Sequence, residues 1–173
     1  MPEAHEAVPW LDDDQLYDWM STVGLVMALA PALDAQLKRD AGLNLFEYHV
    51  LVILAEAPRH GVPMTDLAVM TQGSPSRLSH AVARLEAAGW VVRRACTEAG
   101  RRTAAELTPA GLTKLEESAP GHVREVRRLV IDVLDPQQLT ALGEASRAII
   151  RGIDPVLSEA IEERARRDQP SGS

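Results

Sequence analysis

The chain has 173 residues, of which 46% are hydrophobic and only 3% aromatic, so aliphatic side chains must supply the core. Its single cysteine, Cys96, excludes an internal disulfide framework and suits a reducing cytoplasm. A formal net charge of −7 argues against a surface that binds polyanions everywhere, but the charge is uneven. Residues 75–103 carry six arginines against two glutamates, a local charge of +4 that leaves −11 on the rest of the chain. One basic stretch on an acidic protein gives an anion a preferred side to bind.

The N-terminal residues show no basic segment followed by an apolar run, so we predict no signal peptide. Two prolines and no periodicity make residues 1–11 a flexible arm that ends near Trp10. The most apolar stretches, residues 23–33 and 50–55, are too short or too amphipathic to span a bilayer. We therefore expect a soluble, cytoplasmic protein without membrane association.

A long helix is predicted over residues 12–43. Aspartates at positions 12 to 14 supply its N-cap and a favourable charge, and a glycine at position 42 ends it. Apolar side chains recur at helical spacing through Leu16, Met20 and Val23 and continue beyond Pro31, so the proline should bend the helix without ending it. A helix this apolar lies either in a subunit interface or in a buried core, and we favour subunit association.

Two shorter helices follow. Asn44 and Glu47 form a predicted capping box for the first of them, which a proline stops. The loop after it can hold a short strand near Val62. The next helix covers about residues 65–71, with Thr65 as its cap or as a polar residue of its first turn.

Residues 72–73 make a turn before the fourth helix. Ser74 caps this helix and Pro75 takes its first position, where a missing N–H costs nothing. Helical spacing gives the helix one apolar and one polar face. The apolar face consists of Leu78, Ala81, Val82 and Leu85, and the polar face consists of Ser76, His80 and Ala83, flanked by Arg77, Ser79 and Arg84.

A β-hairpin is predicted next. Residues 90–95 are β-branched and aromatic enough for a strand, and residues 103–107 pair back as a second strand. The connection between them contains a glycine and places Arg101 and Arg102 at or near its tip.

The remaining chain is predicted to be helical. A Thr-Pro pair at 108–109 opens a fifth helix, which we expect to continue as one bent helix through Pro120. An Asp-Pro pair at 135–136 caps a sixth helix, and a second such pair at 154–155 should break or kink it. Residues 168–173 are disordered by composition.

A helix, a glycine-containing turn and a second helix with a polar outer face match a helix-turn-helix. The second helix of such a unit fits the DNA major groove, where its N-terminal residues reach base edges. Ser76, Ser79 and His80 offer hydrogen-bond donors and acceptors, while Arg77 and Arg84 can reach phosphates or bind a guanine bidentately. The arginine-tipped hairpin would be a wing over the adjacent minor groove.

A winged helix can also dock another protein, because a helical hairpin beside a β-hairpin is in itself only a fold. The acidic net charge leaves that alternative open: a dimeric winged-helix module that does not bind DNA. Confinement of the arginines to one stretch favours DNA. The sequence therefore predicts a winged helix that binds DNA.

The central segment resembles the winged helix-turn-helix of the MarR family of transcriptional regulators. The likeness is carried by MTDLAVMTQGSPSRLSHAVARLEAAGWVVRR and by GRRTAAELTPAG, and it extends over essentially the whole chain. It implies a mainly α fold with a small β-hairpin wing (α+β), in which residues 44–108 form the DNA-binding domain. It also implies an obligate homodimer joined by residues 12–43 and 109–167. Such dimers bind pseudo-palindromic operators on double-stranded DNA, commonly as repressors released by a small ligand or an oxidant.

The resemblance also implies site residues. Ser74, Ser76, Arg77, Ser79 and His80 match recognition-helix positions, and Arg101 matches the wing-tip arginine. The family's wing usually carries an aspartate two residues before that arginine, where this chain has Ala99; the adjacent Glu98 could substitute for it. The full predicted DNA-binding set is Thr65, Ser74, Ser76, Arg77, Ser79, His80, Arg84, Arg101 and Arg102.

A small-molecule effector pocket between the dimer helices and the winged domain is likewise implied by the resemblance. Such pockets combine apolar area with a few polar groups. The alternative, in which the same side chains form the dimer core, stays open. The candidates are Trp19, Met20, Tyr48 and His49, with Trp10 and Met27 beside them.

Other chemistry finds less support. Neighbouring arginines would favour the thiolate of Cys96, but oxidant-sensing relatives usually place their cysteine in the N-terminal helical region, so we favour a bystander cysteine. The five histidines lack paired metal-ligand spacing, and we predict no metal and no other cofactor. The sequence shows no nucleophile–base arrangement and no glycine-rich phosphate loop, so we predict no enzymatic activity.

Overall fold

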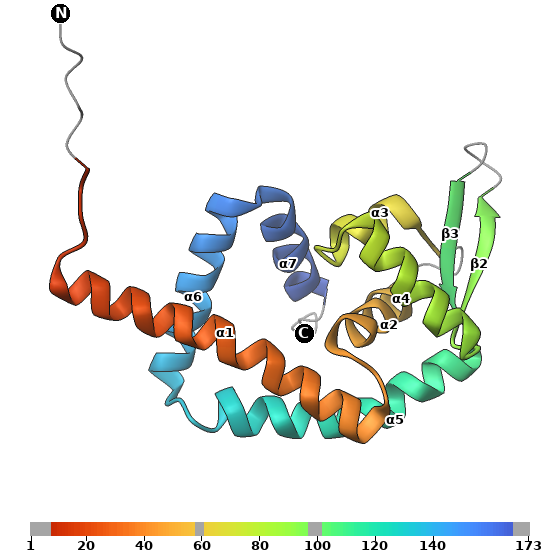
Figure 1. Ribbon diagram of the computed structural model, residues 1–173, viewed down its shortest axis with the longest axis horizontal. Coiled ribbons are helices and arrows are strands. Elements are labelled where there is room, and N and C mark those ends of the chain that lie inside the picture. The colour runs from red at the N-terminus through yellow and green to blue at the C-terminus, as the bar shows by residue number, and fades with distance from the viewer. Residues whose placement is uncertain (1–7, 58–60, 97–101, 168–173) are drawn as a thin grey trace, which may run out of the picture.

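The computed structural model describes residues 8–57, 61–96 and 102–167 and places a winged helix beside a frame of long helices (Figure 1). The mainly α class with a small β-hairpin wing is confirmed. The predicted disordered tail and most of the predicted N-terminal arm lie outside the described residues. The helices are α1 (Asp13–Ala41), α2 (Leu45–Glu56), α3 (Met64–Met70), α4 (Pro75–Ala87), α5 (Pro109–Val126), the π-helical η2 (Arg127–Ile131), α6 (Pro136–Ile153) and α7 (Pro155–Arg167). The strands are β1 (Val62–Pro63), β2 (Val91–Cys96) and β3 (Arg102–Leu107).

α1 begins and ends where its sequence predicts. The Asp12 carboxylate accepts the Gln15 N–H at 2.8 Å, and the Gln15 side chain accepts the Asp12 N–H at 3.1 Å, which closes a capping box. Gly42 ends the helix with a φ of +66°, a left-handed conformation that glycine adopts without strain. Pro31 lies inside the helix and does not end it.

The N-terminal half of α1 projects away from the rest of the subunit (Figure 1). No charged residue lies between Asp18 and Asp34, and the most apolar 18-residue window of α1 has a mean hydropathy of 1.3. By length and composition α1 could cross a membrane, so the expectation that no stretch meets this test is wrong. Counting only residues 23–33 underestimates the apolar run, because the uncharged stretch already begins after Asp18 and the helix is continuous across it. A helix that is buried against a second subunit meets the same test.

The three strands form one antiparallel sheet in the order β1-β3-β2. β1 pairs with β3 through Val62 opposite Ala105, which confirms the short strand predicted near Val62. β2 pairs with β3 from Val91 opposite Leu107 outward. β2 and β3 project together as the wing (Figure 1), so β1 anchors the base of the wing to the chain that leads into α3.

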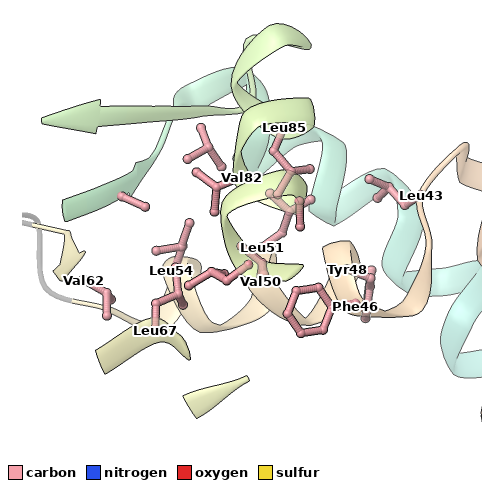
Figure 2. Packing of buried hydrophobic residues seen from close by; sticks show 14 of the residues in the cluster. Leu43, Phe46, Tyr48, Val50, Leu51, Leu54, Val62, Leu67, Val82 and Leu85 are labelled. Atoms are coloured by element: carbon pink, nitrogen blue, oxygen red, sulfur yellow. The ribbon is translucent and has the colours of Figure 1, made fainter. Parts of the chain in front are cut away.

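The hydrophobic core lies between α2, α4 and the sheet (Figure 2). α4 contributes Leu78, Val82 and Leu85, and α2 contributes Val50 and Leu51; each of these side chains is at most 1% exposed. The inward face of α4 is therefore the apolar stripe that the sequence predicts. Full burial of a Leu or Val side chain contributes about 1.5–3 kcal/mol. This contact fixes the rotation of α4 about its axis and turns the polar face outward.

α5 leaves the wing and runs alongside α1 (Figure 1). The Thr108 hydroxyl caps it by accepting the Gly111 N–H at 3.0 Å. Pro120 lies inside the helix, so the prediction of one continuous helix is confirmed. The helix then widens into η2, and the Asp132 N–H reaches the Arg127 carbonyl at 2.8 Å. The sequence pattern does not predict this change of pitch.

Two Asp-Pro pairs start the last two helices. Asp135 accepts the N–H groups of Gln137 at 2.8 Å and Gln138 at 2.9 Å at the start of α6. Asp154 accepts the Leu157 N–H at 3.0 Å at the start of α7. The second pair therefore breaks the helix. α7 folds back and lies between α6 and the winged helix (Figure 1).

Replacing glycine by alanine should have opposite effects on the free energy of unfolding at two helical positions. A Cβ on Gly111 would lie 2.0 Å from the Trp90 carbonyl oxygen, whereas a Cβ on Gly152 would meet nothing within 4 Å. Gly111→Ala should lower the free energy of unfolding by about 1–3 kcal/mol, because the start of α5 must move away from Trp90. Gly152→Ala should raise it by up to about 1 kcal/mol through helix propensity. Urea denaturation followed by circular dichroism measures both, and a Gly111→Ala protein as stable as wild type would contradict the close approach.

Candidate nucleic-acid interface

The turn before α4, the predicted recognition helix, fixes where this helix begins. Ser74 caps α4 by accepting the Arg77 N–H at 3.2 Å, and Pro75 takes the first position, both as predicted. Gln72 has a φ of +52°, and among the residues that the structure describes it is the one non-glycine residue with positive φ. A left-handed residue two positions before the cap reverses the chain sharply between α3 and α4.

Thr65 lies in the first turn of α3. Its hydroxyl donates to the Asp66 carboxylate at 3.0 Å. The N-cap of α3 is Pro63, and no side chain caps the helix. Of the two roles predicted for Thr65, the first-turn position is therefore confirmed and the cap is wrong, because the helix starts one residue earlier than predicted.

α4 presents a continuous polar face to solvent. All predicted site residues on this helix are exposed, while Leu78, Val82 and Leu85 between them are buried. The DNA major groove admits one α-helix, and such a face meets base edges and phosphates with hydroxyl, imidazole and guanidinium groups. The exposed residues are Ser76, Arg77, Ser79, His80 and Arg84.

Two arginines of this face are ordered by the N-terminal turn of α2. The Arg77 guanidinium lies 4.2 Å from the centre of the Phe46 ring. Arg84 binds the Glu47 carboxylate at 2.6 Å, and the second oxygen of Glu47 accepts the Asn44 N–H at 2.9 Å. Glu47 is only 6% exposed, so the α2 capping box and the Arg84 ion pair share one nearly buried carboxylate. Arg77 and Arg84 therefore lie along the flank of α4 that faces α2.

A groove of about 840 Å³ opens between α3, α4 and the wing. Its walls combine apolar side chains such as Val69 with Thr65, Ser79 and Arg93. The Arg93 guanidinium donates to the Ser79 carbonyl at 2.9 Å, and the Arg93 backbone N–H donates to Glu86 at 3.2 Å. Arg93 thus links the wing to α4. Arg93 belongs to the basic stretch, but the sequence pattern predicts no role for it, because its partner is a backbone carbonyl on another element.

Part of the wing lies outside the described residues. Arg94 pairs with Glu106 across the two strands at 2.7 Å. The predicted contact of Arg101, and the effect of Ala99 beside it, fall outside the described residues and stay predictions. The backbone of Arg102 pairs with Cys96, but the side chains of these two residues are not described either.

The predicted effector residues do not come together within one subunit. Trp19 is 56% exposed and Met20 is 65% exposed, both on the projecting half of α1. Tyr48 is buried on α2, where its ring centre lies 4.6 Å from that of His122 on α5, and His49 is exposed. Among residues 8–57, 61–96 and 102–167, no three His, Cys, Asp or Glu residues are grouped as metal ligands.

His122, on α5, is partly buried, and the sequence pattern predicts no role for it. Its Nδ1 is buried and makes no hydrogen bond to the described residues. Burial lowers the pKa of His122, and the nearby His49 lowers it further. Partial desolvation, followed by the charge of Arg164, also lowers the pKa of His49. Both imidazoles therefore resist protonation in the folded chain.

Protonation of His122 should destabilise the fold. Because the folded chain holds its pKa below the unfolded value of about 6.5, the unfolded chain binds more protons, and stability falls as the pH drops through about 6.5. His122→Phe keeps a ring against Tyr48 without the titration. Its free energy of unfolding should fall less than that of wild type between about pH 8 and pH 5.5. Urea unfolding at a series of pH values measures this, and identical slopes would contradict it.

The sequence model of the MarR family matches residues 41–102 of this chain. The fold is similar to Sco3205, a MarR family transcriptional regulator from Streptomyces coelicolor solved in complex with DNA. The TM-score is 0.82 and the identity 43%, and the match covers 87% of this chain and 94% of that one. AbsC, a MarR family regulator from the same organism, gives a TM-score of 0.77 at 37% identity and covers 83% of this chain and 97% of its own.

A curated relative points in the same direction. The HTH-type transcriptional repressor YetL of Bacillus subtilis is 28% identical over 97 residues, which are 56% of this chain. The match spans only 58% of the length of that relative.

Proposed function

The chain belongs to the MarR family of transcriptional regulators, and on that premise we propose that it is a sequence-specific, DNA-binding repressor. It acts as a homodimer on a pseudo-palindromic operator in double-stranded DNA and is released by a small-molecule effector. Regulators of this family are not enzymes. We place the protein in the cytoplasm, where it works by binding alone and without a cofactor.

One observation carries the proposal: the exposed face of α4 follows a turn that is preset by Gln72, Ser74 and Pro75. The buried stripe behind this face leaves it no freedom to rotate. A rigid helix with polar groups at its N-terminal end is the form in which proteins read base edges in the major groove. The likeness to a relative solved with DNA supports the same conclusion.

Individual roles follow from position. Ser76, Ser79 and His80, on the outermost part of α4, contact base edges. Arg84, held by Glu47, binds a phosphate at the flank of the groove, and Arg77 reaches either a guanine or a phosphate beside it. Thr65 contacts the DNA backbone, and Ser74 fixes the start of α4 as its N-cap. Arg101 and Arg102 of the wing enter the minor groove.

Dimerisation involves the helices at both ends of the chain. The helices of residues 12–43 and 109–167 supply the interface, each through part of its surface, and residues 44–108 form the DNA-binding domain. The exposed apolar side chains of α1 support this division, because they have the composition of a covered face. A two-fold dimer places its recognition helices about one helical turn, roughly 34 Å, apart on the DNA.

The effector site requires both subunits. Trp19 and Met20 lie on the projecting half of α1, whereas Tyr48 and His49 lie on α2 (Figure 1). A pocket that combines all four therefore needs a second copy of the chain. Binding there would change how the dimer helices meet and so the spacing of the recognition helices.

Selection of bound sequences from a random pool of DNA duplexes tests the function directly. Arg77→Ala should weaken binding to the selected operator by about 1–3 kcal/mol, and it should relax the preference at one position if Arg77 reads a base. The control Arg147→Ala removes the same charge from an exposed site on α6 and should leave affinity unchanged. Wild-type affinity should fall steeply with salt through counterion release. A wild-type protein that enriches no sequence would refute the proposal.

A charge placed on the exposed face of α1 should break the dimer. Met27 is 71% exposed in the subunit, so Met27→Glu should leave the fold of each chain intact while burying a carboxylate in the interface. We expect the dimer dissociation constant to rise at least about tenfold. Light scattering at micromolar concentration measures the mass, and circular dichroism checks the fold. A monomeric wild type would contradict dimerisation through this helix.

A further inference from the structure

We propose that Asp154, at the corner between α6 and α7, is a positioning residue for the recognition helix. Through its hydrogen bond to Gln72 it holds the turn that precedes α4, and it thereby couples the C-terminal helices to DNA binding. This inference rests on the proposed function, because its main readout is operator affinity.

Gln72 donates two hydrogen bonds through its side-chain amide nitrogen. Its Nε2 donates to the Val69 carbonyl at 3.2 Å, at the end of α3, and to Asp154 Oδ2 at 2.9 Å. Its backbone N–H also donates to the Val69 carbonyl at 3.1 Å. The left-handed backbone of Gln72 is therefore supported from within α3 and from a residue 82 positions away. Two residues later Ser74 caps α4.

Asp154 divides its two carboxylate oxygens between two tasks. Oδ1 caps α7 by accepting the Leu157 N–H at 3.0 Å, and Oδ2 accepts the Gln72 amide. The Leu157 N–H, followed by the Gln72 amide, lowers the pKa of Asp154, so the carboxylate stays ionised and keeps both bonds at neutral pH. One residue thus fixes the start of α7 and the turn of the helix-turn-helix in the same place.

A second tie holds α7 in the same position. Arg164 binds the Glu56 carboxylate at 2.5 Å, which links α7 to the end of α2. Arg151 of α6 binds Glu162 of α7 at 2.9 Å and joins these two helices to each other. α7 lies between α6 and the winged helix in Figure 1. A shift of the C-terminal helices therefore pulls on the turn before α4.

The position of this turn matters because the N-terminal residues of a recognition helix reach the base edges. Base contacts need hydrogen-bond geometry, whereas phosphate attraction tolerates displacement. Loss of the Gln72–Asp154 bond should therefore weaken binding to the operator and leave binding to unrelated DNA unchanged. Direct contact of Asp154 with DNA would act in the opposite direction, because the carboxylate repels phosphate and its removal would strengthen binding to all DNA.

Three variants of the full-length protein test the coupling. Asp154→Ser leaves one oxygen for the Leu157 N–H and no second oxygen for Gln72. Gln72→Asn keeps a residue that tolerates the left-handed backbone, but its side chain is one methylene shorter, so its amide no longer reaches Asp154. The third variant carries both changes. The control Asp135→Ser makes the same substitution in the other Asp-Pro cap, whose carboxylate bonds run to Gln137 and Gln138 of its own helix.

We expect Asp154→Ser and Gln72→Asn each to weaken operator binding about threefold to tenfold. Because both remove the same bond, the double variant should bind the operator as well as the single variant with the larger loss. Asp135→Ser should stay within about twofold of wild type. Affinity for an unrelated duplex should not change in any variant. Three results would each overturn the proposal. They are a double variant whose loss of affinity is the product of the two single losses, an Asp154→Ser protein with wild-type operator affinity, and a loss of affinity for unrelated DNA equal to that for the operator.

Amide hydrogen exchange in the free protein separates this inference from the proposed function. The Gly73 N–H donates to the Ala68 carbonyl at 3.1 Å, within the turn that Gln72 holds. Asp154→Ser should speed exchange at Gly73, and Asp135→Ser should not. If wild type enriched no operator, the proposed function would fail, but faster exchange would still support the tie. Unchanged exchange at Gly73 would overturn it whatever the result with DNA.

Discussion

The apolar stripe of α4 is the contact on which the rest of the structure depends. Leu78, Val82 and Leu85 pack against α2 and the sheet, and only one rotation of the helix buries all three. The outward direction of the polar side chains is a consequence of that burial, which is worth several kcal/mol in total. α2 also carries the groups that order Arg77 and Arg84, so the same packing that builds the core places the flank of the proposed DNA-binding face.

Several arginines of the basic stretch make hydrogen bonds and ion pairs within the subunit. Arg84, Arg93 and Arg94 each bind an acidic side chain or a backbone carbonyl within the subunit. The positive potential at this surface is therefore weaker than a formal local charge of +4 implies. An arginine that is paired with a carboxylate attracts a polyanion only at short range. On an acidic protein this arrangement limits attraction to unrelated DNA. Discrimination then depends on how well α4 is positioned, which gives weight to any contact that fixes its turn.

Caps, turns and helix faces follow from residues three or four positions apart, and these features could be predicted from the sequence. The capping box at Asn44, the glycine end of α1 and the outward face of α4 are of this kind. Contacts between distant elements could not be predicted, because they depend on how those elements pack against each other. The Arg93 bond to the Ser79 carbonyl, the rings of Tyr48 and His122, and the bond between Gln72 and Asp154 all belong to this second kind.

The apolar side chains of α1 stay exposed in the folded subunit. The core of the winged helix closes within a single chain, so folding does not have to wait for association. Pairing of two subunits, by contrast, is second order in their concentration. Before it pairs, a subunit is a folded monomer with an uncovered helix, the form that proteases and chaperones would meet. The synthesis rate of the protein would then set a delay between translation and occupancy of the operator.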